Sequence, residues 1–325
     1  MTEPDPAERL EGAILGEQPL YDAAQVAEKA GVTLDQARRL WRALGFPEHG
    51  GATAYTDSDA AALATLVDAV ESGLVDFDLA VTLTRAVGTT LARLADWEVS
   101  ALSQRVDDLV AQAEEPLTRM DVSGRMLAEL GPSFERLLIF SWRRHLAAAT
   151  TRMLALGENE EDRNTVEVTV GFADIVAFTA LSNELSRDRI GDLVEKFESR
   201  CADVVAGQRG RVIKSIGDSV LFVNDDPIAA YDTAEGIINV IGRDPRMPDV
   251  RVGLASGPTV MRLGDVFGPP VNMAARLTAV ARRNRIIIDA ETAALLPEDQ
   301  FETRRLPARP VRGFGLVEPV AVRRH

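Results

Sequence analysis

The period of the hydrophobic pattern changes once along this chain of 325 residues, and no other feature constrains the fold as strongly. From Leu20 to Leu156 apolar residues recur at helical spacing, and no stretch alternates convincingly with period two. A polar and charged run, GENEEDRN, follows, and beyond it apolar and polar residues alternate over positions 166–170. Residues 1–157 are therefore predicted to form an all-helical domain, and residues 158–325 a domain that contains strands.

Local signals divide the helical part into several short helices and one long one. Thr33 and Gln36 have the spacing of a capping box, and the helix that they begin ends at Gly45. The segment DAAQVAEKA forms a helix before it, and a further helix ends at Gly73. These helices resemble the helix-turn-helix of MerR-type proteins. Residues 133–157 are predicted to form one long helix that links the first domain to the second.

The order of elements in the second domain predicts its fold class. After the first strand we expect a helix at about 186–206, a hairpin at 211–223, a helix at about 227–241, a strand at 250–255, a helix at about 270–282, a strand at 285–289, another helix and a final β ribbon. The opening order βαββαβ is typical of the ferredoxin-like arrangement, in which helices cover one face of a largely antiparallel sheet. The predicted class is therefore α+β, with a ferredoxin-like βαββαβ domain preceded by an all-α domain.

The charge balance excludes several classes of protein. The chain has 36 basic and 50 acidic residues, and residues 1–150 alone hold 24 acidic against 13 basic ones. Because such a surface repels polyanions, we expect no nucleic acid among its partners. No window approaches the roughly 18 consecutive apolar residues of a membrane span, and the N-terminus is acidic where a secretory signal is basic. We therefore expect a cytoplasmic protein without a transmembrane segment.

Two aspartates stand where a strand has just ended or turned. Asp174 follows the first strand in GFADIVAFT, and Gly217 and Asp218 form the centre of a two-residue hairpin turn. Taken singly, the first reads as a helix cap and the second as a turn residue. Adjacent central strands would bring the two carboxylates together, where they repel each other unless a cation lies between them. A hard dication with a phosphate as a further ligand is the usual resolution.

A third motif, GDVFGPPVNMAARL, combines amide, guanidinium and carboxylate groups. Its prolines set the start of a helix, on which Asn272 and Arg276 are four residues apart and share a face. Such a pair is usually part of a solvated helix face, but together the two groups suit a ribose oxygen and a phosphate undergoing substitution. Asp265 precedes this helix as a hydrogen-bond acceptor. Lys214, one of only three lysines in the chain, lies four residues before Asp218 and is the corresponding donor.

Four motifs stand in one order along the second domain: FADIVAFT, VIKSIGDSVLF, VRVGLASGPTVMRLGDVFGPPVNMAARL and PVRGFG. With them, the stretch from about Val166 to Val322 resembles a class III nucleotidyl cyclase catalytic domain. The resemblance implies conversion of ATP to 3′,5′-cyclic AMP and pyrophosphate with two Mg²⁺ or Mn²⁺ ions per site. The residue roles that it implies are metal binding by Asp174 and Asp218, adenine recognition by Lys214 and Asp265, ribose orientation by Asn272, transition-state stabilisation by Arg276 and phosphate binding by Arg312.

The chemistry of the base also favours ATP. Adenine offers an amine donor and the N1 acceptor, which a carboxylate and an ammonium complement, whereas guanine requires the reverse pattern. Guanylyl cyclases of this class carry Glu and a small residue such as Cys at the positions of Lys214 and Asp265. Two positions depart from the family pattern: Ala177 replaces a glycine in the loop near the triphosphate, and Arg312 replaces a lysine. We expect reduced activity at most from the first and retained phosphate binding from the second.

The resemblance also implies an assembly and a regulatory domain. Each site of the family is composite, so we expect a head-to-tail homodimer with two equivalent sites and an inactive monomer. The first domain resembles the helical regulatory domain of actinobacterial cyclases, which is associated with responses to pH and to fatty acids. His145 lies in the long linking helix beside two arginines, where protonation would add charge. It is a candidate pH switch, and a plain solvated helix position is the alternative.

A second function class is a DNA-binding regulator that uses a degenerate cyclase domain as an ATP sensor. The segment RRLWR, Arg38 to Arg42, would then have to contact phosphates, although the acidic domain around it repels them. Diguanylate cyclases and polymerase palm domains share the sheet topology. The first of these lacks its GGDEF signature here, and neither explains Lys214 together with Asp265.

Overall fold

A computed structural model of the chain describes residues 6–113, 117–155, 165–262 and 264–325. By their contacts the residues divide into two compact units, Met1–Ala148 and Ala149–His325. The domain boundary that the sequence predicts, between residues 157 and 158, lies outside the described residues and stays a prediction. None of the helices in the described ranges has the length and apolar character that crossing a membrane requires.

The first unit is helical, as the sequence predicts. Its helices are α1 (Pro6–Leu15), α2 (Ala23–Lys29), α3 (Leu34–Leu44), α4 (Asp57–Glu71), α5 (Phe77–Gln112) and the larger part of α6 (Arg119–Ala155). The capping box at Thr33 and Gln36 is present, and Gly45 ends α3 in the left-handed conformation with φ of 86°. Leu40 and Trp41 of α3 are buried against α2 and α4 residues such as Leu63. The two-helix unit and the helix after it are therefore confirmed.

The long helix α6 begins earlier than the sequence predicts. We expected it to start at Ser133, after a glycine and a proline, but it starts at Arg119 and contains Pro132 in its interior. Proline removes one backbone hydrogen bond from a helix, which normally ends or bends it. Here residues on both sides of Pro132, including Leu127 and Leu138, line one groove with α1 and α5.

Two of the arginines in RRLWR already have partners inside the first unit. Arg39 forms an ion pair with Asp78 at 2.8 Å, and Arg42 forms one with Glu48 at 3.4 Å. Trp41, between them in this segment, is buried. Neutralised guanidinium groups are poor phosphate contacts, so the structure adds a local argument against the DNA-binding alternative.

The second unit is built on one twisted sheet. Its elements are β1 (Thr165–Ile175), α7 (Phe178–Glu184), α8 (Arg187–Gly207), β2 (Arg211–Ile216), β3 (Ser219–Asn224), α9 (Pro227–Gly242), β4 (Val250–Arg262), β5 (Asp265–Phe267), α10 (Pro269–Val280), β6 (Ile286–Ile288), α11 (Ala290–Leu295), β7 (Phe301–Arg305), β8 (Arg309–Val311), β9 (Gly315–Val317) and β10 (Val320–Arg324). In the described residues the strand order is β2-β3-β1-β4-β6-β10-β7, with β5 added on β4 and a separate ribbon of β8 and β9. The segment β2-β3-β1-β4 is antiparallel throughout, which confirms the ferredoxin-like prediction.

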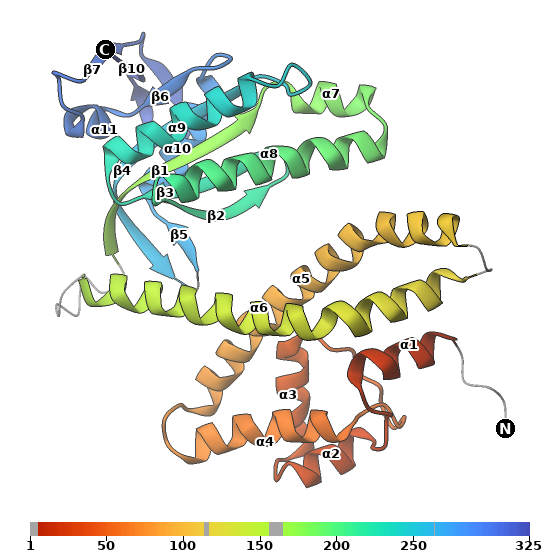
Figure 1. Ribbon diagram of the computed structural model, residues 1–325. Helices are drawn as coiled ribbons and strands as arrows, with labels where there is room; N and C mark the ends of the chain where they lie inside the picture. The colour runs from red at the N-terminus through yellow and green to blue at the C-terminus, as the bar shows by residue number, and fades with distance from the viewer. Residues whose placement is uncertain (1–5, 114–116, 156–164, 263) are drawn as a thin grey trace. The chain divides into compact units, whose positions relative to one another are not determined.

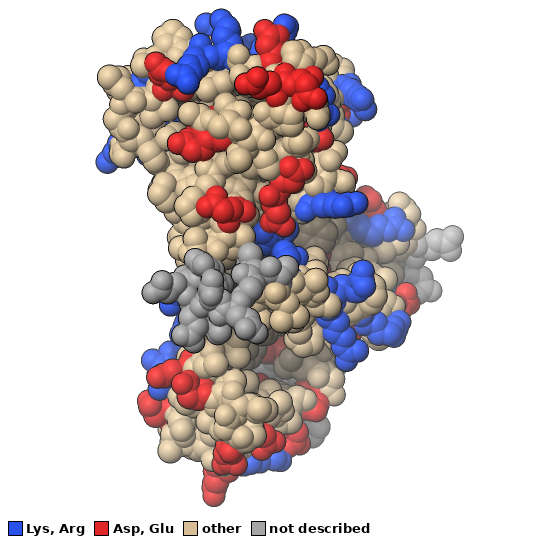
Figure 2. All heavy atoms as spheres, turned by 90° about the vertical axis from the view of Figure 1, so that its left-hand side faces the viewer, with Lys and Arg blue, Asp and Glu red and all other residues tan. Residues whose placement is uncertain are grey.

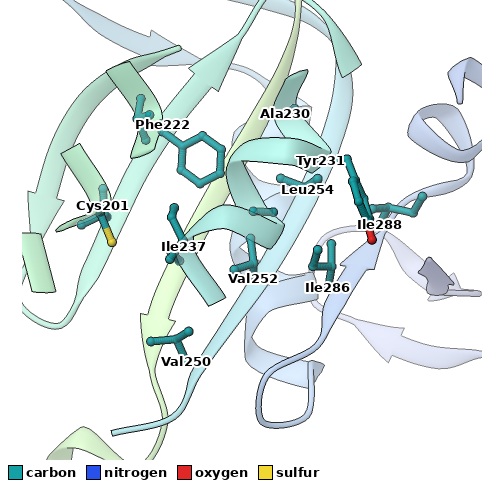
Figure 3. Packing of buried hydrophobic residues seen from close by; sticks show 14 of the residues in the cluster. Cys201, Phe222, Ala230, Tyr231, Ile237, Val250, Val252, Leu254, Ile286 and Ile288 are labelled. Atoms are coloured by element: carbon teal, nitrogen blue, oxygen red, sulfur yellow. The ribbon is translucent and has the colours of Figure 1, made fainter. Parts of the chain in front are cut away.

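Helices cover both faces of this sheet. Figure 1 shows α8 and α9 in front of the central strands and α10 behind them. On the first face Phe222 of β3 and Ile237 of α9 are fully buried, and Figure 3 shows them with Cys201 of α8 in one apolar cluster. On the second face Leu277 of α10 is buried against residues of β1 and β3, including Val170. This double packing makes the sheet a rigid support for residues at its ends.

A glycine sets how closely α10 approaches the sheet. A Cβ atom on Gly253 of β4 would lie 2.4 Å from the Thr278 backbone nitrogen and 2.5 Å from the Ala274 carbonyl oxygen. The Thr278 hydroxyl also donates a hydrogen bond to the Phe172 carbonyl of β1 at 3.2 Å. Since the buried face of α10 is held against the backbone of the sheet, its opposite face projects outward in a fixed direction. That outer face carries two of the predicted site residues.

Candidate active site

The two predicted metal-binding aspartates come from adjacent strands. Asp174 near the end of β1 pairs with Ser219 of β3, and Asp218 is the turn residue immediately before Ser219. Gly217 opens the turn with φ of 62°, a left-handed conformation that glycine adopts without strain. The backbone N–H of Ile175 donates to the Asp218 carbonyl oxygen at 3.1 Å, which ties the turn to the end of β1. The sheet register therefore brings the two carboxylates together, as the sequence predicts.

The electrostatics of this pair fit a divalent cation. Burial raises the pKa of the Asp218 carboxyl, and the negative charge of Asp174 raises it further. Asp174 itself is only 9% exposed, so its charge is poorly screened by water. Two carboxylates with a phosphate as a further ligand are a typical Mg²⁺ donor set, and a dication would relieve their repulsion. Within the described ranges no cluster of three or more metal-ligating side chains competes with this pair.

Two neighbours of Asp174 were not predicted from the sequence. The Ser219 hydroxyl donates a hydrogen bond to Asp174 Oδ1 at 2.6 Å, and Arg251 Nε donates one to Oδ2 at 2.8 Å. Arg251 lies on β4 directly opposite Asp174, and its Nη1 donates to the Ala279 carbonyl at 3.1 Å. The only signal in the sequence was a charged residue inside an otherwise apolar strand. Arg251 thus compensates the charge that a bound cation would also compensate.

The predicted base-recognition pair is already formed. Lys214 Nζ on β2 lies 2.5 Å from Asp265 Oδ2 on β5, and the Val266 backbone N–H donates to Asp265 Oδ1 at 2.8 Å. Partial burial alone would raise the pKa of Asp265, but the hydrogen bonds from Lys214 and Val266 outweigh it and lower that pKa. The pair is therefore a charged donor and a charged acceptor side by side, both partly exposed.

Three further predicted residues line one cavity. Asn272 and Arg276 project from the outer face of α10, and Arg312 lies in the turn between β8 and β9. Together with two glycines, one proline and Phe314 they surround a cavity of about 460 Å³. Gly268 precedes α10 with φ of 144°, which only glycine adopts readily, and prolines occupy the first turn as predicted. An amide and two guanidinium groups around one cavity have the chemistry that suits an anion with a sugar attached.

Within one chain the predicted groups form an aspartate pair, a Lys214 and Asp265 pair, and a cavity that includes neither pair. Neither Asp174 nor Asp218 lines the cavity that holds Asn272, Arg276 and Arg312. A cavity with cationic groups but no metal-binding carboxylate lacks half of the predicted chemistry. A second copy of the chain could supply the missing carboxylates.

Ala177, one of the two positions that depart from the family pattern, has a strained backbone. Ala177 adopts φ of 57° and ψ of 32°, the left-handed conformation, directly before α7. A Cβ atom in this conformation costs roughly 1 kcal/mol or more, so Ala177→Gly is expected to raise the free energy of unfolding by about 1 kcal/mol in urea denaturation. Ala180→Gly, inside α7 with helical backbone angles, is the matched control and is expected to lower it. Equal effects of the two changes would contradict the assignment of strain. The effect of Ala177 on activity stays a prediction.

The raised pKa of Asp218 makes a second prediction about stability. A raised pKa means that the folded state holds this proton more tightly than the unfolded chain, so stability falls as the pH rises from the ordinary value of 3.8 through the raised pKa. In EDTA at pH 7, Asp218→Asn should therefore raise the thermal unfolding midpoint, by about 1 to 2 °C because the carboxyl is partly exposed. Asp203→Asn, an exposed position on α8, removes the same charge as a control. An unchanged or lowered midpoint for Asp218→Asn would contradict the prediction.

Parts of the chain are similar to known proteins. Residues 160–322 match the family described as the adenylate and guanylate cyclase catalytic domain. An adenylate cyclase of Streptomyces coelicolor is 38% identical over 96% of this chain and 88% of its own length. A protein of Mycobacterium tuberculosis named a pH-sensitive adenylate cyclase is 31% identical over 96% of this chain and 80% of its own. The catalytic core of a rhodopsin-guanylyl cyclase is 27% identical, with a TM-score of 0.47, over 50% of this chain and 98% of that structure.

Proposed function

Because the chain belongs to the adenylate and guanylate cyclase family, we propose that it converts ATP to 3′,5′-cyclic AMP and pyrophosphate. The observation that carries the choice of ATP is the Lys214 and Asp265 pair, which is formed at 2.5 Å. An ammonium donates to adenine N1, and a carboxylate accepts from the exocyclic amine. Guanine presents the opposite pattern of donor and acceptor at these two positions, so it would leave both charged groups without partners.

The reaction needs an in-line substitution at the α-phosphorus. The ribose 3′-oxygen forms a new bond to the α-phosphorus and loses its proton, while the bond to the departing pyrophosphate breaks. Asn272 holds the ribose, and Arg276 donates to the α-phosphate oxygens, on which negative charge grows in the transition state. Arg312 neutralises part of the charge on the leaving phosphates. No covalent intermediate with the protein is required.

Asp174 and Asp218 would hold the divalent cations, as the repulsion between them indicates. Cations bound there would lower the pKa of the ribose 3′-hydroxyl and neutralise negative charge on the triphosphate. Family membership implies dependence on a divalent metal. We propose that the metal is Mg²⁺ or Mn²⁺, with two ions in each site.

We further propose that the active form is a head-to-tail homodimer. One subunit provides the two aspartates, and its partner provides the base-reading pair, Asn272 and the arginines. The absence of both aspartates from the cavity lined by Asn272, Arg276 and Arg312 supports this arrangement. It gives two equivalent sites in each dimer and none in a monomer.

The direct test is incubation of the purified chain with labelled ATP or labelled GTP and Mn²⁺. Cyclic AMP from ATP with little cyclic GMP from GTP is the expected result. The rival function, a DNA-binding regulator with an inactive cyclase domain, predicts no cyclic nucleotide and retardation of random duplex DNA in a gel shift at 50 mM salt. The acidic first unit and its paired arginines do not favour it.

The signal that the first unit receives stays a prediction. A groove of about 460 Å³ in this unit has a mainly apolar lining from α1, α5 and α6, which suits the chain of a fatty acid. Glu98 and Glu135 also line it and would repel a carboxylate headgroup. The groove therefore supports an apolar regulator better than an anionic one.

His145 is an exposed side chain on α6. If it is the pH switch, His145→Ala should flatten the dependence of cyclic AMP production on pH between 5.5 and 8, because the added charge on protonation is lost. His49→Ala, a change at a histidine in a loop of the first unit, is the control and should leave the profile as it is. Identical profiles for the wild type and His145→Ala would reject this residue as the switch.

A further inference from the structure

A further cavity in the second unit lies outside the proposed catalytic site. It measures about 720 Å³ and is lined by residues that follow α10 and by residues of β6, β7, β8 and β10. None of its lining residues belongs to the cavity around Asn272, Arg276 and Arg312. Its volume falls in the range of roughly 300 to 1,000 Å³ that is typical of small-molecule sites.

The charge of the lining is the reverse of the charge of the chain. Acidic residues outnumber basic ones 50 to 36 in the whole sequence. The cavity nevertheless has five arginines in its lining and one acidic residue, Glu302. The arginines come from four separate segments and are Arg282, Arg285, Arg304, Arg309 and Arg323. Figure 2 shows basic and acidic side chains side by side at the top of the second unit.

Only one of the five arginines has a carboxylate partner among the described residues. Arg323 Nε donates to Glu302 Oε2 at 2.6 Å, so these two charges cancel. The other four guanidinium groups form no ion pair within the described ranges. Four unpaired cations around one concavity repel each other, and the concave shape concentrates their field on any anion that enters.

The arginines next in sequence to two of these unpaired ones do have carboxylate partners. Arg283, next to Arg282, forms an ion pair with Asp249 at 3.7 Å, and Arg305, next to Arg304, forms one with Glu318 at 3.3 Å. Neither of these paired arginines lines the cavity. At these two places in the sequence, the unpaired arginine lines the cavity and its paired neighbour does not.

The floor of the cavity is apolar. Ile287 is buried and lines it together with Val280, Leu306 and Ala321. Guanidinium groups at the rim match phosphate oxygens with planar forks of donors, and an apolar floor accepts the uncharged body of a ligand. Four net positive charges correspond to two or three phosphate groups rather than to a single carboxylate.

We infer that this cavity binds a small anion that carries at least two phosphate groups, either an inorganic polyphosphate or a nucleotide. The site is separate from the catalytic one, and the inference does not rest on the proposed cyclase activity. Arg282, Arg285, Arg304 and Arg309 are the phosphate-binding groups. The apolar floor contacts the rest of the ligand when it is a nucleotide.

The test measures binding by isothermal titration calorimetry with the full chain in EDTA. All proteins carry Arg276→Ala and Arg312→Ala, which remove phosphate-binding groups from the catalytic cavity. Inorganic tripolyphosphate and GTP are titrated separately. We expect about one site per chain with a dissociation constant below about 1 mM for at least one probe. Tighter binding of GTP would identify a nucleotide site, and equal or tighter binding of tripolyphosphate would identify a polyphosphate site.

Two double variants in this background locate the site. Arg282→Ala with Arg304→Ala should weaken binding by roughly tenfold to a hundredfold, because charge-assisted contacts to phosphate are lost. Arg283→Ala with Arg305→Ala removes the same charge from the adjacent positions and should weaken it by less than about threefold. All four side chains are exposed, so both proteins should fold, and circular dichroism checks that they do. If a double variant does not fold, Arg304→Lys replaces it, because lysine keeps the positive charge but lacks the planar pair of guanidinium donors. Equal weakening in both double variants, or no binding of either probe, would overturn the inference.

Discussion

Co-expression of Asp218→Ala and Arg276→Ala chains is expected to restore about a quarter of the wild-type production of cyclic AMP. Each variant alone should lose activity by at least about a thousandfold, because one lacks a metal-binding carboxylate and the other lacks the transition-state guanidinium. If the chains pair at random, about half of the dimers contain one chain of each kind. In such a dimer one of the two sites has both intact halves. Cyclic AMP is measured on purified protein of equal concentration.

The matched control pairs two variants that damage the same half of the site. When Asp218→Ala is co-expressed with Asp174→Ala, both sites of every dimer lack one metal-binding aspartate, so activity should not return. Recovery in this control, or its absence in the first pair, would contradict the composite homodimer. The geometry motivates the choice of residues, since the two aspartates meet across β1 and β3 while Arg276 lines a cavity without either of them.

The second large effect concerns the choice of base. Replacement of Lys214 by Glu and of Asp265 by Cys is expected to lower the rate with ATP by at least about a hundredfold and to produce cyclic GMP from GTP. The change reverses the pattern of hydrogen-bond donor and acceptor that the base meets. Adenine would then leave its own polar groups and the Glu carboxylate without hydrogen-bond partners in the site. Rates with both nucleotides under the same metal concentration give the ratio of specificities.

A variant with alanine at both positions separates loss of recognition from a new specificity. It should lose activity with ATP without gaining activity with GTP, because it presents neither pattern. The two residues contact each other at 2.5 Å, so single changes would leave an unpaired charge and are less informative. Retained preference for ATP in the Glu and Cys variant would show that other residues read the base.

Local signals in the sequence were sufficient for much of the fold. The helix α3 begins at the capping box of Thr33 and Gln36 and ends at Gly45, because a side-chain cap and a left-handed glycine act over a few residues. Alternation of apolar residues identified β1, and the turn residues Gly217 and Asp218 identified the hairpin. The predicted start of α6 was wrong, because the helix continues through Pro132 although proline locally disfavours a helix interior.

Contacts between distant segments were not accessible in this way. Arg251 reaches Asp174 because β4 lies next to β1 in one particular register, and these residues are 77 positions apart. The arginine-lined cavity collects residues from four segments that share no motif. Such contacts depend on strand order and register, which side-chain periodicity does not specify for strands of similar composition.

The residue types and spacings alone determined the chemistry: a pair of carboxylates, an ammonium with a carboxylate for the base, and an amide with guanidinium groups for ribose and phosphate. Those motifs are short, and only Asn272 and Arg276 share one backbone segment, the helix α10. The tertiary structure alone decided which group neutralises Asp174, which residues share a cavity, and where unpaired arginines converge. The physical reason is that burial and charge compensation act through space, on neighbours that only the packed sheet and helices create.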